Sequence, residues 1–191
     1  MKVHVFGLGA IGSNLIIQLM KQYPDFEYYG YDYDTVEGRN IGPQAFFLEQ
    51  IGAPKALAIP AIASRFSRKV KYIPMNRKVE VPQTQLFNDP DTLFIDCFDN
   101  AESRKLLYKG DAKNMLHIGF SPFYTAEIIW DKDYDVPGDV DQTQNDICEM
   151  EDATPFVHFV VNFAALIISK YINEEVNDSY IITGKTGIKK L

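Results

Sequence analysis

The sequence predicts an α/β protein with a doubly wound, Rossmann-like and mostly parallel sheet that has helices on both faces. The first 32 residues have the pattern of a strand, a glycine-rich turn, a helix and a second strand. Segments with strand and helix patterns then continue to alternate along the chain, as in proteins of this class. A length of 191 residues without an internal repeat suits a single domain over residues 1–191.

The first strand–helix–strand unit is predicted within residues 2–32. Residues 2–6 form an apolar run typical of a strand, and the glycine-rich turn follows at once. Residues 14–23 have the pattern of a helix, which Pro24 ends. Residues 27–32 are rich in aromatic side chains and end on an acid, which predicts the second strand. Because a helix joins the two strands, we expect them to be parallel.

The later elements continue this alternation. Further helices are predicted at 55–66, 101–109 and 155–172, and further strands at 70–73, 92–97, 115–119 and 125–130. The run at 92–97 is continuously apolar and bounded by turn residues, which is typical of a buried strand in a parallel sheet.

The composition narrows the class of protein. With 46% hydrophobic and 24% charged residues, the chain is expected to be globular rather than disordered. Two cysteines, Cys97 and Cys148, are too few for a disulfide framework or a four-cysteine zinc site. The chain has no run of 18 apolar residues, and its first residues enter a strand. We therefore expect no signal peptide, no membrane partner and a cytoplasmic location.

Negative charge is concentrated in residues 131–152. This segment holds nine acidic residues and one basic residue, Lys132, for a net charge of −8; the whole chain carries −7, so the remainder carries +1. The segment is either a solvated, flexible loop or a mobile flap that docks a basic partner. Because a broad basic face is missing, binding of nucleic acid is not expected.

A glycine motif follows the first predicted strand. Gly7, Gly9 and Gly12 fit the pattern G-x-G-x-x-G, with Ile11 inside it. The first glycine permits a tight turn, the second lets backbone approach a phosphate, and the third lets the helix lie close to the sheet. Asp32 ends the next strand 20 residues after Gly12, where a carboxylate accepts hydrogen bonds from ribose hydroxyls and disfavours a 2′-phosphate. The motif predicts a nucleotide site; the alternative is a fold that has lost its nucleotide.

The residues after Asp32 resemble the ThiF/MoeB family, relatives of the ubiquitin-activating enzymes. Residues 32–36 match its D-x-D-x-V pattern, residues 51–55 match I-G-x-x-K, and residues 96–104 match D-x-x-D-N-x-x-x-R. Between them, two residues match the family's S-N-L-x-R-Q segment, Asn40 and Gln44. The resemblance covers about residues 2–119, with a similar apolar helix near the C-terminal end.

The resemblance implies binding of ATP and Mg²⁺ and transfer of AMP to a carboxylate, usually the C-terminus of a ubiquitin-like protein. It implies that Asp32 holds the ribose, that Lys55 neutralises phosphate charge and that Asp99 binds magnesium. The other implied nucleotide contacts are Asp34, Asn40, Gln44, Asn100 and Arg104. The residues of the glycine motif complete this nucleotide-binding set.

Simpler interpretations of two of these residues remain open. Lys55 can be a solvated lysine at the start of a helix. Asp99 can be the N-cap of the helix predicted at 101–109, because a carboxylate there accepts hydrogen bonds from free N–H groups. The cap and the magnesium role are compatible.

The sequence departs from the family pattern in three ways. Pro43 stands where the family has an arginine that contacts the triphosphate, and Arg39 is the candidate substitute. The resemblance therefore gives Asp99, Lys55 and Arg39 as the catalytic residues. The chain starts directly at the first predicted strand, so we expect no arginine-bearing N-terminal arm, and the family's paired C-x-x-C zinc motifs are missing.

Several reactive residue types have a simpler explanation. Acidic neighbours should raise the pKa of Cys148 and make it a poor nucleophile. The three histidines are expected at core or edge positions rather than in catalysis: His4, His117 and His158. Residues 182–186 resemble part of a phosphate-binding loop, but the required earlier glycine is Ser179 and no helix can follow.

The sequence thus predicts ATP-dependent adenylation of a carboxylate. The expected acceptor is a ubiquitin-like or other small protein, or a peptide, with a free C-terminus. The alternative is a catalytically degenerate relative that binds a nucleotide or a partner as a scaffold; an NAD-binding oxidoreductase is a third hypothesis. A groove for the acceptor tail needs apolar surface beside the site, and four aromatic residues are candidates for it: Phe120, Phe123, Tyr124 and Trp130. The resemblance also implies a homodimer.

Overall fold

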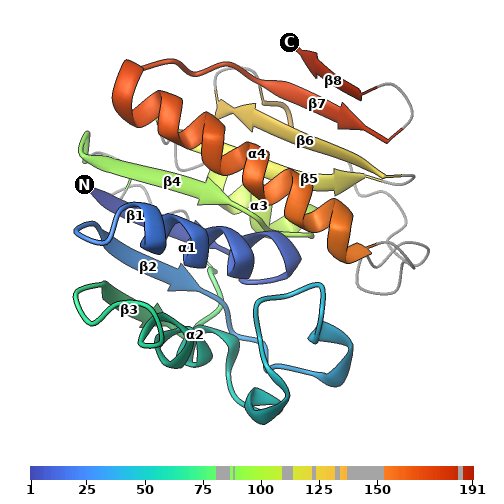
Figure 1. Cartoon of the computed structure of the whole chain (residues 1–191). Helices are drawn as coiled ribbons and strands as arrows, with labels where there is room; N and C mark the ends of the chain where they lie inside the picture. Colours follow the sequence, from blue (N-terminus) through green and yellow to red (C-terminus); the bar gives the residue numbers. More distant parts are fainter. Residues whose placement is uncertain are drawn as a thin grey trace.

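An eight-stranded sheet forms the centre of the molecule in the computed structural model (Figure 1). The structure describes residues 1–80, 87, 89–108, 114–121, 124–131, 134–136, 153–184 and 187–191. The strands are β1 (Lys2–Phe6), β2 (Glu27–Tyr31), β3 (Lys71–Met75), β4 (Thr92–Asp96), β5 (Met115–Ser121), β6 (Thr125–Trp130), β7 (Tyr180–Thr183) and β8 (Gly187–Lys190). Their order is β3-β2-β1-β4-β5-β6-β7-β8; the pairings from β3 to β5 are parallel and the rest antiparallel.

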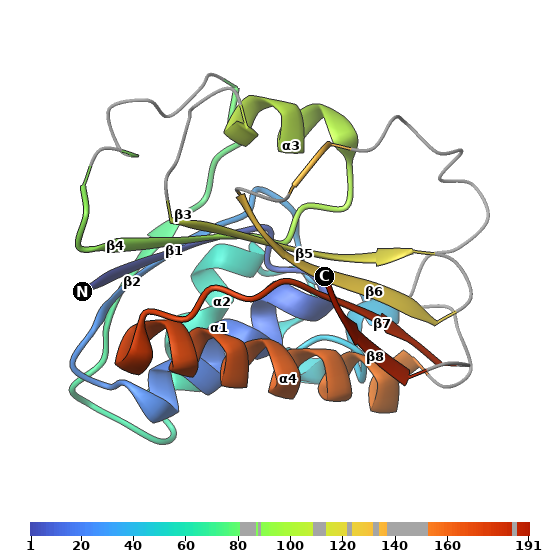
Figure 2. The same ribbon diagram turned by 90° about the horizontal axis from the view of Figure 1, so that it is seen from above.

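Helices cover both faces of this sheet, as predicted. On one face lie α1 (Ala10–Gln22), α2 (Lys55–Ala63) and α4 (Ala153–Glu174), and on the other lies α3 (Ala101–Tyr108) (Figure 2). Two short 3₁₀ turns, η1 (Gly38–Asn40) and η2 (Leu48–Gln50), lie between β2 and α2. The α/β, doubly wound, Rossmann-like fold is therefore confirmed.

The core has two parts, one on each face. The larger part contains the inward side chains of the central strands together with those of α1, α2 and α4. The smaller part, on the face of α3, is largely aromatic and consists of Phe6, Tyr31, Val79, Phe87, Phe94, Leu107 and Met115. Burial of apolar surface on both faces explains why Leu93, Phe94 and Ile95 of β4 follow one another without a polar residue.

Helix α2 accommodates an internal proline, Pro60. Proline lacks an N–H group, so it cannot donate to the carbonyl four residues earlier, at Ala56. The hydroxyl of Tyr72 on β3 donates to that carbonyl instead, at 3.0 Å. The helix thus continues through Pro60 to Ala63, three residues short of its predicted end at 66.

Helix α4 is long and apolar enough to cross a membrane when judged by length and composition alone. Its best 18-residue window has a mean hydropathy of 1.5, and 39% of that window is buried. In the fold, α4 packs against α1, and the side chains of Val157, Val160, Ala164 and Ile168 face the core.

The sequence did not predict the last two strands. Strands β7 and β8 continue the sheet beyond β6, and the four residues of β8 are all exposed. The segment rejected as a phosphate-binding loop begins in β7, and a strand rather than a helix follows it.

Candidate functional site

The glycine motif forms a tight turn where β1 ends, next to the ends of β2 and β4. The N–H of Gly7 donates to the carbonyl of Tyr31 at 2.9 Å, and the φ of Gly7 is +84°. A Cβ atom on Gly12 would lie 1.9 Å from the Gly7 carbonyl oxygen, so this position tolerates glycine alone. At Gly9, apart from the adjoining chain, no heavy atom of the described residues lies within 4 Å of the corresponding Cβ position. The surrounding protein therefore leaves no space for a side chain at Gly7 and Gly12, whereas the space at Gly9 is open.

Asp32 connects this turn to the chain that follows β2. Its carboxylate is buried, and it accepts hydrogen bonds from the N–H groups of Leu8 at 2.7 Å and Asp34 at 2.8 Å. Burial raises the pKa of Asp32 above its ordinary value, and Lys55 and these N–H groups partly offset that effect. The carboxylate thus lies beside the glycine turn, at the position predicted for the ribose contact.

Lys55 lies at the start of α2 and reaches toward the same edge. Its side chain is 10% exposed, and its Nζ lies 3.4 Å from Oδ2 of Asp34, whose side chain is 53% exposed. The backbone N–H of Lys55 donates to the Asp34 carbonyl at 2.8 Å. The interpretation of Lys55 as a solvated lysine is therefore wrong: the structure buries its stem and directs its charge to the carboxylates at the end of β2.

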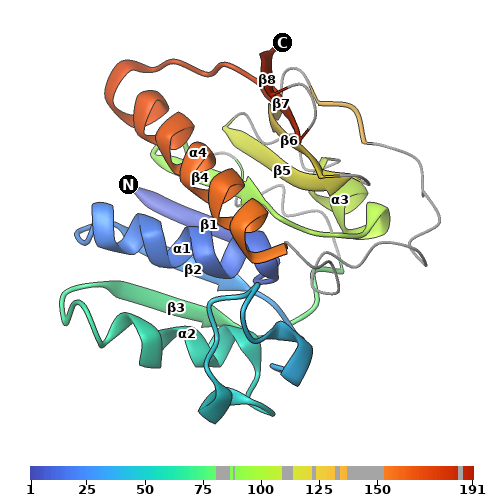
Figure 3. The same cartoon turned by 45° about the vertical axis from the view of Figure 1, so that its right-hand side comes forward.

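The segment that contains η1 and η2 folds back onto the start of α1. The N–H of Ala45 donates to Oγ of Ser13 at 3.1 Å, and Nδ2 of Asn14 donates to the Pro43 carbonyl at 2.8 Å. A Cβ atom on Gly42 would lie 3.7 Å from Oγ1 of Thr154, in the first turn of α4. Figure 3 shows this segment at the edge where β2 ends, near the start of α4.

Of the three predicted site residues in this segment, two are buried and one is exposed. Asn40 and Gln44 are buried, and Oδ1 of Asn40 accepts a hydrogen bond from the N–H of Glu37 at 2.8 Å. Arg39 is 55% exposed and forms an ion pair with Glu37 at 2.7 Å. In this arrangement Asn40 shapes the turn, while Arg39 lies on the surface.

In the turn after β4, the residue that caps α3 differs from the predicted magnesium ligand. Oδ1 of Asn100 accepts a hydrogen bond from the N–H of Ser103 at 2.8 Å, which is the N-cap interaction. The interpretation of Asp99 as the cap is therefore wrong. The residue is exposed, and its Oδ1 accepts a hydrogen bond from Nδ2 of Asn100 at 3.3 Å. Cys97 and Phe98, which precede it, lie against the glycine turn.

These residues fit a nucleotide with a magnesium ion better than a metal bound by protein alone. Among the residues that the structure describes, no group of three or more His, Cys, Asp or Glu side chains could hold a metal. Magnesium commonly binds through one or two carboxylates together with substrate phosphates. Asp99 provides an exposed carboxylate in the turn after β4, and Gly9 leaves room for a phosphate in the turn after β1.

Comparison with known proteins decides the family. The profile of the ThiF family matches residues 1–181. The chain belongs to the ThiF family.

Solved structures of PaaA and MccB have the same fold as this chain. The structure of PaaA superposes with a TM-score of 0.75 at 14% identity, over 100% of this chain and 63% of that one. Escherichia coli MccB with MccA gives 0.75 at 14% identity, and MccB with ATP gives 0.73 at 16%; each match covers 100% of this chain and 63% of that one. The chain thus spans less than two thirds of the length of these structures. No curated protein sequence matches it.

The side chain of Arg104 has protein partners in this ThiF-family chain. Its side chain, which was predicted to contact the nucleotide, is buried. It donates to the Phe98 carbonyl at 2.7 Å, to the Tyr134 hydroxyl at 2.9 Å and to Glu127 at 3.3 Å. A direct contact with a nucleotide would require these interactions to break.

Sequence reasoning missed the partners of Arg104. Tyr134 and Glu127 were not candidates, and His117 was expected only as a core or edge residue. His117 is indeed buried, but it contacts Asp96, which lies opposite it in the register of β4 and β5. The available signal was only a histidine and an aspartate in consecutive predicted strands, which does not give the register between them.

The predicted groove for an acceptor tail is only partly supported. The rings of Phe120 and Tyr124 each lie 5.5 Å from that of Phe156, near the start of α4. Trp130 was wrongly included: it is buried and packs against Tyr171 on α4. Phe123 lies outside the described residues.

The remaining candidates have these positions. Cys97 is largely enclosed beside Asp96, and burial raises the pKa of its thiol, as expected of an unreactive cysteine. His4 is buried, as expected, whereas His158 is exposed on α4 and is not a core residue. Cys148 and most of the acidic segment 131–152 lie outside the described residues.

Proposed function

We propose that this chain catalyses the ATP-dependent adenylation of a carboxylate. The observation that carries the proposal is the arrangement of Asp99 and Gly9. The Asp99 carboxylate is exposed, Cys97 and Phe98 just before it lie against the glycine turn, and Gly9 in that turn leaves room for a phosphate. Membership of the ThiF family supports the same function.

The proposed reaction joins an acceptor carboxylate oxygen to the α-phosphorus of ATP. The bond between the α-phosphorus and its bridging oxygen to the β-phosphate breaks, and pyrophosphate leaves with the electron pair. Negative charge builds up on the leaving group, so cationic groups beside it lower the barrier. Magnesium bound through Asp99 would neutralise part of that charge.

Other residues of the chain have supporting roles in this proposal. The Asp32 carboxylate binds the hydroxyls of the ribose and so orients the sugar. The open backbone at Gly9 provides space for the phosphates near the start of α1. Lys55 provides positive charge, for which Asp34 is the resting partner. Arg39 is the second cation; its exposed ion pair with Glu37 is weak enough to exchange for a phosphate.

We further propose that the acceptor is a peptide or small protein with a free C-terminus. The aromatic cluster of Phe120, Tyr124 and Phe156 provides apolar surface near the start of α4 for such a tail. Structures of the related MccB include one with MccA and one with ATP, which supports a carboxylate acceptor and ATP as the donor. Homodimerisation, implied by the family, belongs to the same proposal.

A second candidate function is binding of ATP without adenylation. It is favoured by Pro43, which stands where the family has a triphosphate-binding arginine and whose carbonyl is held by Asn14. With Arg104 buried as well, fewer cations surround the phosphates than in the family pattern. Turnover, rather than binding, separates the two functions.

The test is ATP–pyrophosphate exchange by the purified chain with magnesium and a pool of random heptapeptides. Peptides with a free C-terminal carboxylate should support exchange, and the same pool with amidated C-termini should not. Asp99→Asn should abolish exchange, whereas Glu102→Gln, which removes an exposed carboxylate in the first turn of α3, should not. If the chain binds ATP but neither pool supports exchange, adenylation is wrong and the binding function is favoured.

A further inference from the structure

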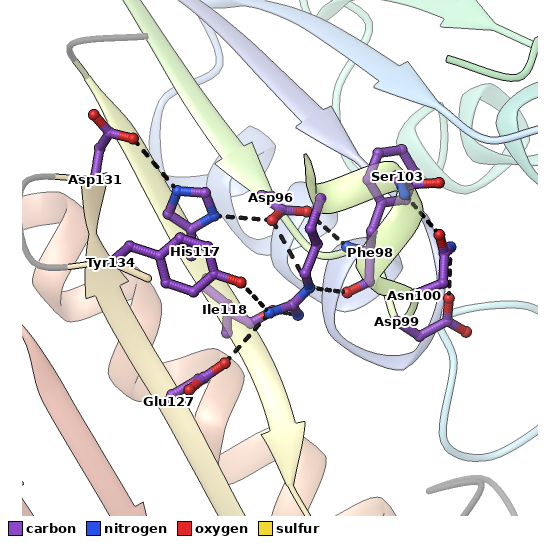
Figure 4. Close-up of polar contacts among 11 residues, drawn as sticks. Asp96, Phe98, Asp99, Asn100, Ser103, His117, Ile118, Glu127, Asp131 and Tyr134 are labelled. Atoms are coloured by element: carbon purple, nitrogen blue, oxygen red, sulfur yellow. Dashed lines mark hydrogen bonds and ion pairs between the residues drawn. The ribbon is translucent and has the colours of Figure 1, made fainter. Parts of the chain in front are cut away.

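A largely buried cluster of polar side chains lies to one side of the turn that carries Asp99 (Figure 4). We name it the Arg104–His117 cluster; its members are Asp96, Arg104, His117, Glu127, Asp131 and Tyr134. They come from the end of β4, from α3, β5 and β6, and from the chain that leaves β6. The function proposed above gives most of them no role.

Arg104 joins three elements through one guanidinium. Its Nε donates to the Phe98 carbonyl at 2.7 Å, and its terminal nitrogens donate to the Ile118 carbonyl on β5 and to Glu127 on β6, both at 3.3 Å. A Cβ atom on Gly119 would lie 2.6 Å from Nη2, so the backbone leaves space for the guanidinium only because this residue is glycine. Such a fixed fork of donors is a geometry that lysine cannot reproduce.

His117 occupies the centre of the cluster. Its Nδ1 donates to Oδ2 of Asp96 at 2.9 Å, and its ring stacks on Tyr134 with 3.6 Å between centroids. Its Nε2 lies 3.7 Å from Oδ1 of Asp131, which is the distance of an ion pair rather than a hydrogen bond. Burial alone would lower the pKa of His117, but the carboxylates of Asp131 and Asp96 raise it above the ordinary value despite nearby Arg104.

Arg104 and His117 both connect the turn before Asp99 with the chain that leaves β6. On one side, the Asp96 carboxylate accepts a hydrogen bond from the N–H of Phe98 at 3.0 Å while Arg104 holds the Phe98 carbonyl. On the other side, Arg104 donates to the hydroxyl of Tyr134 and His117 stacks on its ring. A displacement of Tyr134 must therefore disturb the turn before Asp99.

We propose that Arg104 and His117 are positioning residues, which tie the turn carrying Asp99 to the chain leaving β6 without contacting nucleotide or acceptor themselves. The catalytic meaning of this coupling rests on the proposed function. The coupling itself does not, because it concerns two parts of the resting protein. It makes the placement of Asp99 depend on the position of Tyr134.

Amide hydrogen exchange, followed by NMR without nucleotide, tests the coupling. Tyr134→Phe removes the hydroxyl held by Arg104, and we expect about tenfold faster exchange of the Phe98 and Ser103 amides relative to β1 amides in the same sample. Tyr28→Phe is the matched control, because it removes a buried hydroxyl that is bonded to Leu19 and Tyr23 instead. Equal relative exchange in Tyr134→Phe and wild type would overturn the proposal.

The pH dependence of amide protection distinguishes the proposed role of His117 from a purely structural one. After correction for intrinsic exchange, protection of the Phe98 amide in the wild type should fall as pH rises through the pKa of His117. The charged and titratable groups that face His117 are Asp96, Arg104, Asp131 and Tyr134. Histidine is the side chain whose ordinary pKa lies nearest the range of about pH 6 to 8. His117→Gln should make protection independent of pH in this range; an unchanged profile would contradict the role of His117.

Calorimetric titration with ATP and magnesium separates this proposal from the proposed function. Arg104→Lys keeps the charge but not the fork, and we expect its affinity for Mg–ATP to fall about tenfold. If the wild type binds no Mg–ATP while the exchange coupling is present, the function fails and the positioning network stands. If the wild type binds Mg–ATP and Tyr134→Phe changes neither exchange nor affinity, the positioning proposal fails and the function stands.

Discussion

Two glycines in the turn and helix that follow β1, Gly12 and Gly9, differ in why the position holds a glycine. Gly12 is required by packing, because the carbonyl of Gly7 occupies the place of a side chain. Gly9 has open space where a Cβ would stand. A glycine that packing does not demand is expected where a ligand approaches.

Alanine substitutions at these two positions should therefore have opposite effects. Gly12→Ala should lower the free energy of unfolding by about 3 kcal/mol through overpacking. Gly9→Ala should keep the wild-type melting temperature and weaken Mg–ATP binding at least about tenfold, because the methyl group fills the space for phosphate. Thermal unfolding and calorimetric titration measure both effects; unimpaired Mg–ATP binding by Gly9→Ala would place the phosphates elsewhere.

Two buried histidines on the strands β1 and β5 should affect stability with opposite signs. Burial, together with nearby Lys2, lowers the pKa of His4 to about 4, whereas the pKa of His117 is raised. Between pH 6.5 and 4 the unfolded chain binds a proton at His4 that the folded chain does not, so His4 should cost on the order of 3 kcal/mol of stability on acidification. The stabilisation from His117 is fully present below pH 6.5 and is lost as pH rises through its raised pKa.

Denaturant unfolding at several pH values checks these signs. His4→Phe keeps an aromatic ring between its neighbours, and it should remove most of the loss of stability between pH 6.5 and 4. His117→Gln should be most destabilising, relative to wild type, at pH 6 and less so at pH 8. A penalty for His117→Gln that grows with pH would show that its folded-state pKa is lowered instead.

At the scale of elements, α3 depends on its first residues more than on its length. The helix has eight residues, too few to be stable alone, and Asn100 supplies its cap. Asn100→Ala should lower the free energy of unfolding by about 1 kcal/mol, whereas Asn100→Asp, which can also cap, should lower it much less. Asp99→Ala should leave stability nearly unchanged; if it destabilises as much as Asn100→Ala, Asp99 shares the cap.

The edge strands of the sheet are protected against pairing with other chains. Strand β3 carries Pro74, which has no N–H group to offer, and Lys71. Strand β8 ends in Lys189 and Lys190, and the latter forms an ion pair with Asp178 at 2.7 Å. Charged residues and proline at sheet edges disfavour edge-to-edge association. A homodimer of this chain should therefore form through helices or loops rather than through a continuous sheet.

Elements with a strong local pattern were predictable, and those without one were not. The first strand, the turn and α1 follow from apolar runs and glycine spacing within a few residues. Strand β8 has no buried side chain, so it leaves no alternation to detect, and β7 is only four residues long. The 3₁₀ turns η1 and η2 are three residues each and depend on contacts with α1 for their position.

At the scale of the whole molecule, the candidate site was predictable where family motifs mark it. Those motifs identify Asp32, Lys55 and Asp99, which the fold brings to one edge of the sheet. They mislead for Arg104, because a motif gives the residue type and not the direction of its side chain. The partnership of His117 with Asp96 depends on the register between β4 and β5, which no short pattern encodes.

The account depends on one claim, that Mg–ATP binds at the edge of the sheet where Asp99 and Gly9 lie. Calorimetric titration of the purified chain with ATP, with and without magnesium, tests it most directly when repeated with NAD and with Asp99→Asn. We expect magnesium-dependent binding of ATP, no comparable binding of NAD, and a 10- to 100-fold weaker affinity, roughly, in Asp99→Asn. Equal binding of Mg–ATP by the wild type and Asp99→Asn, or preferential binding of NAD, would contradict the claim.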